Sequence, residues 1–141
     1  MKIIFLSFIL CFFVIGCGTS PTAVNEATVP APDRIYVQSL AKFQSNSTLT
    51  LIRDTGLHGA EHVFSIYVNN THVVDLRQGE KFSLPVDSAQ VFIEARMFNV
   101  LGKIPPVQVE TVFTPKKEYV YRVGLDEGIL RLSRDLALTD K

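Results

Sequence analysis

The sequence contains little cysteine. Its 141 residues include two cysteines, Cys11 and Cys17, and both lie near the start of the chain. The region after Cys17 has no further thiol, which excludes disulfides, a CxxC redox pair and a cysteine metal site there. A domain of about 100 residues is large enough to fold around one apolar core without cross-links. Its stability must therefore come from packing.

The sequence also lacks an excess of charge of either sign. It has 14 basic and 14 acidic side chains, and its formal net charge is zero. A protein that binds nucleic acid needs a basic surface to neutralise phosphates. We therefore expect no nucleic acid among its partners.

Long apolar runs are missing after residue 15. The run from Ile3 to Ile15 follows a single charged residue, Lys2, and leads into Gly16-Cys17. It is too short to span a bilayer, which takes about 20 residues, and its layout is that of a cleaved export segment. We predict a bacterial lipoprotein signal peptide at residues 1–16, which is removed to leave Cys17 as a lipidated N-terminus.

The lipid on Cys17 would anchor the chain, and we expect no other cofactor. Several acyl chains at about 0.8 kcal/mol per buried methylene give stable membrane attachment. Gly18, directly after the cysteine, resembles the residue found there in lipoproteins sent to the outer membrane. We therefore expect a cell-envelope protein, lipid-anchored at the outer membrane. In the alternative, the segment is an ordinary secretory signal or a short anchor, and Cys17 is incidental.

The next segment is rich in proline and small polar residues. Residues 18–33 read GTSPTAVNEATVPAPD and show no amphipathic period. With the lipidated Cys17, they predict a flexible tether over residues 17–33. If this tether were extended at about 3.1 Å per residue, it could hold the domain on the order of 50 Å from the lipid.

Helical periodicity is scarce after Asp33, where apolar residues alternate with polar ones, as in strands with one buried face. Turn signals such as Asn69-Asn70 and Asp126-Glu127-Gly128 separate these segments. We predict an all-β fold over residues 34–141, a single antiparallel β-sandwich of seven to nine short strands. The clearest alternating segments are 49–51, 64–68, 91–97, 107–113 and 119–125.

The middle of the chain carries several short motifs. They are Arg53-Asp54-Thr55-Gly56-Leu57-His58-Gly59, Ser65-Ile66-Tyr67-Val68-Asn69, Gly79-Glu80-Lys81 and Leu84-Pro85. Over residues 48–97 the chain resembles small uncharacterised bacterial lipoproteins with a PEGA-like or prealbumin-like β-sandwich domain. The resemblance implies binding or scaffolding in the cell envelope, and it brings no catalytic residues.

One motif suggests metal chemistry. The stretch His58-Gly59-Ala60-Glu61-His62 matches H-x-x-E-H, in which a helix presents two histidine ligands to zinc and the glutamate acts as a base. Gly56 and Gly59 weaken such a helix, and the third ligand would have to be His72 or Glu80. We therefore predict no catalytic residue and no metal. A zinc site on His58, His62 and His72 and a metal-dependent envelope hydrolase are the less favoured alternatives.

Two other regions are candidates for binding. The guanidinium of Arg53 could form a bidentate contact with a ligand carboxylate, or Arg53 and Asp54 could instead close a loop as an ion pair or Asx-turn. Apolar residues in the stretch 99–106 would be costly to leave in water unless they dock or pack. The candidate binding residues are Arg53, Asp54, His58, His62, Val100, Leu101 and Ile104.

These observations favour a non-enzymatic lipoprotein that binds or supports an envelope component. We expect an envelope protein as partner, contacted through a strand edge or through the loops. The alternative is a carbohydrate- or peptidoglycan-binding module with tyrosines as a stacking platform. Two or more tyrosines on one exposed face would favour this alternative, and burial of all four would remove it. The four tyrosines are Tyr36, Tyr67, Tyr119 and Tyr121.

Overall fold

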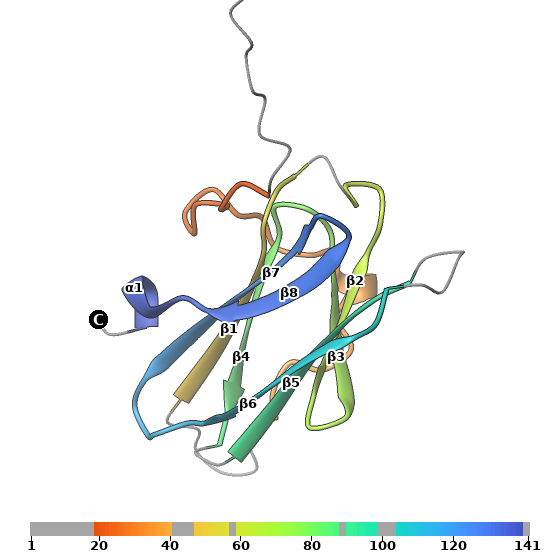
Figure 1. The fold of residues 1–141 in the computed structure, drawn as a ribbon. Coiled ribbons are helices and arrows are strands. Elements are labelled where there is room, and N and C mark those ends of the chain that lie inside the picture. Colours follow the sequence, from red (N-terminus) through yellow and green to blue (C-terminus); the bar gives the residue numbers. More distant parts are fainter. Residues whose placement is uncertain (1–18, 41–46, 57–58, 88–89, 99–103, 140–141) are drawn as a thin grey trace, which may run out of the picture.

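Two four-stranded sheets pack face to face in the computed structural model, which describes residues 19–40, 47–56, 59–87, 90–98 and 104–139 (Figure 1). The first sheet has the order β4 (Lys81–Val86), β1 (Ser47–Arg53), β7 (Glu118–Asp126), β8 (Ile129–Arg134). The second has the order β3 (Thr71–Leu76), β2 (Phe64–Val68), β5 (Gln90–Met97), β6 (Val107–Val112). The prediction of an all-β sandwich is therefore confirmed, with eight strands.

One pairing differs from the predicted antiparallel arrangement. β1 and β7 are parallel, with Thr48 opposite Glu118 and Arg53 opposite Val123, whereas the other strand pairs are antiparallel. Parallel strands need a long crossover connection. Strands β2 to β6 lie between β1 and β7 in the sequence and provide it.

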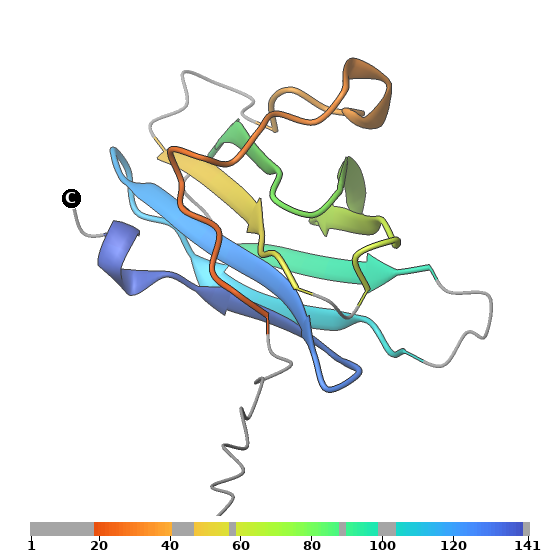
Figure 2. The same cartoon turned by 90° about the horizontal axis from the view of Figure 1, so that it is seen from above.

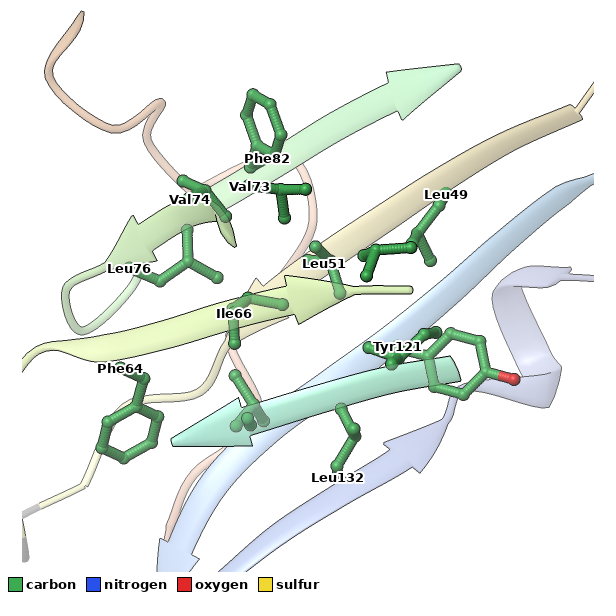
Figure 3. Close-up of a cluster of buried hydrophobic side chains, with 14 of the residues drawn as sticks. Leu49, Leu51, Phe64, Ile66, Val73, Val74, Leu76, Phe82, Tyr121 and Leu132 are labelled. Carbon is green, nitrogen blue, oxygen red and sulfur yellow. The ribbon is translucent and has the colours of Figure 1, made fainter. Parts of the chain in front are cut away.

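Alternating apolar residues from both sheets meet in one core (Figure 3). In β2 and β5 every second residue is buried, as the period of two predicts. Figure 3 shows Leu49 and Leu51 of β1 beside Ile66 of β2, with Tyr121 of β7 near one edge of the cluster.

The hairpin turns form where the turn signals predicted them. Asn69 and Asn70 have φ of 49° and 62° between β2 and β3. Glu127 and Gly128 have φ of 49° and 79° between β7 and β8. Asparagine and glycine tolerate this left-handed conformation, which two-residue hairpins require.

Residues 19–40, here called the N-terminal strap, lie against the sandwich. Isolated bridges join Ser20 to Thr55, Thr28 to Glu80 and Ile35 to Val74. The strap includes a short 3-10 helix, η1 (Pro32–Arg34), and Figure 2 shows its red-to-orange part crossing the sheet of β1 and β7. The prediction of a flexible tether is therefore wrong for residues 19–33.

Three kinds of contact hold the strap. Thr22 and Ala27 are buried, and the strap backbone pairs with positions beside β1, β3 and β4 that would otherwise be open. Arg34 also forms a bidentate ion pair with Glu80, with both distances 2.6 Å. The proline-rich composition did not prevent docking, because the strap residues that make these backbone hydrogen bonds are not prolines.

The chain ends in a short helix, α1 (Leu136–Thr139), which packs near β7. In the described residues, no helix has the length and apolar character needed to cross a membrane.

Candidate binding surface

Arg53, predicted as a ligand-binding residue, is buried inside the fold. It is 2% exposed, and its Nη2 donates to the carbonyl of Gly59 at 2.6 Å. Its Nη1 donates to the carbonyls of Leu76, at 2.9 Å, and of His62. The guanidinium also lies 3.8 Å from the ring centre of Phe64. Arg53 therefore clamps residues 59–62 against β3 and does not face a ligand.

The environment of Arg53 also makes its charged form less favourable than in water, although the guanidinium stays protonated at neutral pH. Burial lowers the pKa of Arg53 to about 10, because the protonated guanidinium loses contact with water. Its donors are directed at neutral carbonyls, which satisfy its hydrogen bonds without forming an ion pair. This arrangement is that of a structural clamp.

Asp54 holds the strap and does not pair with Arg53. Its Oδ1 accepts hydrogen bonds from the amide of Thr22 at 3.0 Å and from Nη1 of Arg122 at 2.6 Å. The same Nη1 donates to the carbonyl of Thr22 at 2.9 Å, and Nε of Arg122 pairs with Asp135 at 2.6 Å. The prediction that Arg53 and Asp54 form a ligand-binding or loop-closing pair is therefore corrected: each residue is committed to a separate structural contact.

The described part of the H-x-x-E-H motif does not form the helix that zinc ligation would need. Residues 59–62 form a turn, in which the amide of His62 donates to the carbonyl of Gly59 at 3.0 Å and Gly59 has a φ of 73°. Nε2 of His62 lies 3.1 Å from Oε1 of Glu61. His58 lies outside the described residues. The described residues contain no group of three potential metal ligands.

The two proposed third ligands also have other partners. Nε2 of His72 lies 2.8 Å from Asp75, and Glu80 is paired with Arg34. Their side chains are therefore used in local contacts.

The predicted docking loop is only partly described. Val100 and Leu101 lie outside the described residues. Ile104 is half-buried and packs against the core, so that it is less exposed than predicted. It lines a hollow of ≈ 330 Å³ on the outer face of the second sheet. The remaining lining residues are Ser65, Tyr67, Arg96, Met97, Phe98 and Pro106.

A row of stacked side chains crosses this face; we call it the aromatic ladder, formed by Tyr36, His72, Tyr67 and Arg96. The ring centres of Tyr36 and His72 are 4.1 Å apart, and those of His72 and Tyr67 are 4.7 Å apart. The guanidinium of Arg96 lies 4.1 Å from the centre of the Tyr67 ring. The ladder therefore joins the strap, β3, β2 and β5 in one continuous surface.

Asp75 fixes one end of the ladder. Its Oδ2 accepts a hydrogen bond from the Tyr36 hydroxyl at 2.8 Å, and its Oδ1 lies 2.8 Å from Nε2 of His72. Burial alone would raise the pKa of Asp75, but hydrogen bonds from Ser65, Tyr36 and His72 lower it below its usual value. The carboxylate is therefore ionised at neutral pH, and it orients both rings.

One aromatic ring of the ladder and one beside it are exposed. Tyr36 is 51% exposed, and Phe98 is 86% exposed. By contrast, Tyr119 and Tyr121 are buried. Two of the four tyrosines, Tyr36 and Tyr67, thus lie on the same side of the sandwich, but His72 and Arg96 stack on the Tyr67 ring, so that Tyr36 is the more accessible of the two.

A second hollow lies on the same sheet, at its other end. It has a volume of ≈ 480 Å³, and Oδ1 of Asn69 beside it accepts a hydrogen bond from the amide of Phe92 at 2.9 Å. All of its lining side chains are uncharged. They are Asn69, Asn70, Gln90, Phe92 and Gln108.

A comparison of the chain with protein-family models, with curated proteins and with solved structures finds no match. The resemblance to PEGA-like lipoproteins therefore stays a prediction.

The ladder was missed because its members are far apart in the sequence. Tyr67 is out of phase with the buried residues of β2, a sign that it points outward. Its opposite neighbours, His72 and Glu94, follow only from the strand register. A correct pairing of β2 with β3 and β5 would have predicted part of this surface.

Proposed function

We propose that this chain is a lipid-anchored, non-enzymatic bacterial envelope protein that binds or supports an envelope component through the outer face of the sheet β3-β2-β5-β6. Lipidation at Cys17 would place it in the cell envelope, with Gly18 favouring the outer membrane. The observation that carries the proposal is the aromatic ladder with the exposed ring of Phe98 beside it. Tyrosine and arginine are enriched at protein interfaces, where exposed aromatic rings become buried.

A protein partner is the first candidate, and a site-specific crosslinker tests it. A photoreactive side chain at Phe98 should capture a discrete partner in native membranes. The matched position is Ser133, which is exposed on the outer face of the other sheet. Equal capture from both positions, or none from Phe98, would contradict binding of a protein at this face.

The anchor needs its own test. Cys17→Ser should release the protein from the membrane fraction, because lipidation requires the thiol of that residue. Retention of the variant in membranes would show that the anchor lies elsewhere.

A glycan is the second candidate ligand, and two observations favour it. Tyr36 and Tyr67 lie on the same side of the sandwich, and the uncharged hollow beside Phe92 offers amide donors and acceptors next to an aromatic ring. Phe92 lies in β5 and Phe98 directly follows the end of that strand, six residues and therefore about 20 Å away. An extended polymer could contact both rings.

Cosedimentation with purified peptidoglycan sacculi distinguishes the two ligands. If the ligand is a glycan, the protein sediments with sacculi and Phe92→Ala weakens this binding. Ile129→Ala, which removes an exposed apolar side chain from the other sheet, should leave it unchanged. No sedimentation of the unaltered protein would leave the protein partner as the proposal.

A further inference from the structure

The direction of the strap determines where the anchored end of the chain leaves the sandwich. The amide of Ser20 donates to the carbonyl of Thr55 at 2.6 Å, and the amide of Thr55 donates to the carbonyl of Ser20 at 3.1 Å. This bridge is antiparallel. Followed towards lower residue numbers, the strap therefore runs towards the carboxyl ends of β1 and of its parallel neighbour β7.

Thr19 is seated against two glycines at this end. A Cβ added at Gly56 would lie 3.2 Å from Cα of Thr19, and one added at Gly124 would lie 3.4 Å from its Cγ2. Both glycines leave room for the strap to approach the sheet closely. The chain is thus held against the sandwich from Thr19 onwards.

Covalent geometry then limits the reach of the anchor. Cys17 is two residues before Thr19, and an extended chain covers about 3.3–3.6 Å per residue. The Cα atoms of Cys17 and Thr19 are therefore no more than about 7 Å apart. A lipid on Cys17 cannot hold this domain on the order of 50 Å from the bilayer, as an extended tether would.

We propose that one end of the sandwich rests on the lipid bilayer; this anchor end comprises Thr19, Gly56 and the β7–β8 hairpin at 126–129. The proposal depends on lipidation of Cys17, as in the proposed function. The hairpin extends about 7 Å beyond Gly124, since each residue of a strand advances about 3.3 Å. At its tip Ile129 is 57% exposed, which places an apolar side chain at the level of the lipid headgroups.

The charged residues of the anchor end would not attract a membrane by themselves, so its contact with the bilayer would depend on the lipid on Cys17. Asp126 and Arg131 form an ion pair of 3.0 Å, and the exposed Glu127 adds a negative charge at the turn, so the hairpin offers no basic cluster that would bind an anionic membrane by itself. The open face with the aromatic ladder would then stand upright on the membrane, and its ligand would be bound close to the bilayer.

Depth-dependent quenching tests this orientation. The chain has no cysteine other than Cys11 and Cys17, so a cysteine introduced elsewhere is the only free thiol of the lipidated mature protein. An NBD fluorophore at Ile129→Cys should be quenched in phosphatidylethanolamine vesicles that contain doxyl-labelled lipid. The same label at Lys117→Cys should not be quenched, because Lys117 directly precedes β7 at its opposite end, nine residues and about 30 Å from Asp126.

Vesicle flotation is measured with each sample, so that a loss of membrane anchoring can be distinguished from a wrong orientation. If the lipidated protein floats with the vesicles but both labels remain equally unquenched, the orientation is wrong. If it does not float, the proposed lipid anchoring is wrong.

A variant with a longer connection between Cys17 and the sandwich is the matched control. Ten glycine and serine residues inserted between Gly18 and Thr19 should lower the quenching at residue 129 while the protein still floats. Unchanged quenching in this variant would mean that the short connection is not what holds the end on the membrane, and would overturn the proposal.

Discussion

The outer faces of the two sheets differ in how far the rest of the chain covers them: β1 and β7 are buried at most positions, whereas β2 and β5 alternate between buried and more exposed residues. The strap covers part of the face of β4-β1-β7-β8, where Thr22 contacts Asp54 and Arg122. The face of β3-β2-β5-β6 carries stacked aromatic rings that remain accessible, with Tyr36 and Phe98 more than half exposed. On the covered sheet the apolar residues Ile52 and Val120 interrupt the alternation and are buried. A distant segment of the same chain can thus occupy the outer face of a sheet.

The clamp behind the covered face should give the largest loss when it is removed. Arg53→Met would leave three carbonyls, two of them in buried contacts, without their charged donor, and we expect it to lower the free energy of unfolding by about 3 kcal/mol or more. Urea denaturation measures this loss. Arg131→Met is the control, since Arg131 is exposed and makes one surface ion pair, which is worth about 0–1 kcal/mol. Equal losses in the two variants would contradict the clamp.

Removing the contact that holds the strap should have the next largest effect. Asp54→Ala deletes the acceptor of the Thr22 amide and of Arg122, and we expect a loss of about 1–3 kcal/mol. Hydrogen exchange should accelerate at the amides of residues 20–28 and change little in β5. Asp126→Ala provides the control, because it removes a more exposed ion pair outside the strap. Unchanged exchange in the strap would show that Asp54 does not hold it.

Acid should weaken the junction between the strap and β4. Burial would raise the pKa of Glu80, but the hydrogen bond from Arg34 and the amide of Arg77 lower it below its usual value of 4.5. A carboxylate with a lowered folded-state pKa contributes stability above its unfolded pKa, and this contribution disappears as the pH falls through the folded-state pKa. The free energy of unfolding should therefore decrease as the pH falls from about 5 to 3.

Glu80→Gln sharpens this prediction. The variant cannot lose a charge at residue 80, so its stability should decrease less steeply over the same pH range, although it is less stable at pH 7. Denaturant unfolding at several pH values measures both slopes. Identical slopes would mean that other carboxylates cause the acid sensitivity.

A substitution on the open face of the sheet β3-β2-β5-β6 should change the stability least. Tyr36→Ala removes a half-exposed ring stacked on His72, and we expect a loss of about 1 kcal/mol together with loss of ligand capture. Tyr36→Phe keeps the ring and loses only the hydrogen bond to Asp75, so it should retain most of the capture. Full capture by Tyr36→Ala would show that the ladder is not part of the binding face.

The strands could be predicted because each needs only local information. Alternation in Phe64–Val68 and Gln90–Met97 directly reflects which side chains face the core. The parallel pairing of β1 with β7 could not be predicted in this way, because it depends on which strands become neighbours after the crossover. The strap was missed for a related reason: composition describes a free segment, and docking depends on a surface made by other parts of the chain.

The candidate binding residues were less predictable than the strands. Arg53 was singled out for its chemistry, yet three carbonyls on two other segments occupy its guanidinium. His72 was considered only as a metal ligand, whereas strand register and the strap place it between two tyrosines. In both cases the partners come from elements distant in the sequence, and only the tertiary structure brings them together.

The parallel pairing of β1 with β7 at the centre of the first sheet also limits how early this sheet can form. Thr48 pairs with Glu118, which lies 70 positions later, so this sheet cannot close until most of the chain has been synthesised. Contacts between distant residues form slowly, because the loop between them must be ordered first. At about 5–20 residues per second, synthesis of the intervening chain takes several seconds. If residues 1–16 direct export, this delay leaves time for the chain to be exported before its core closes.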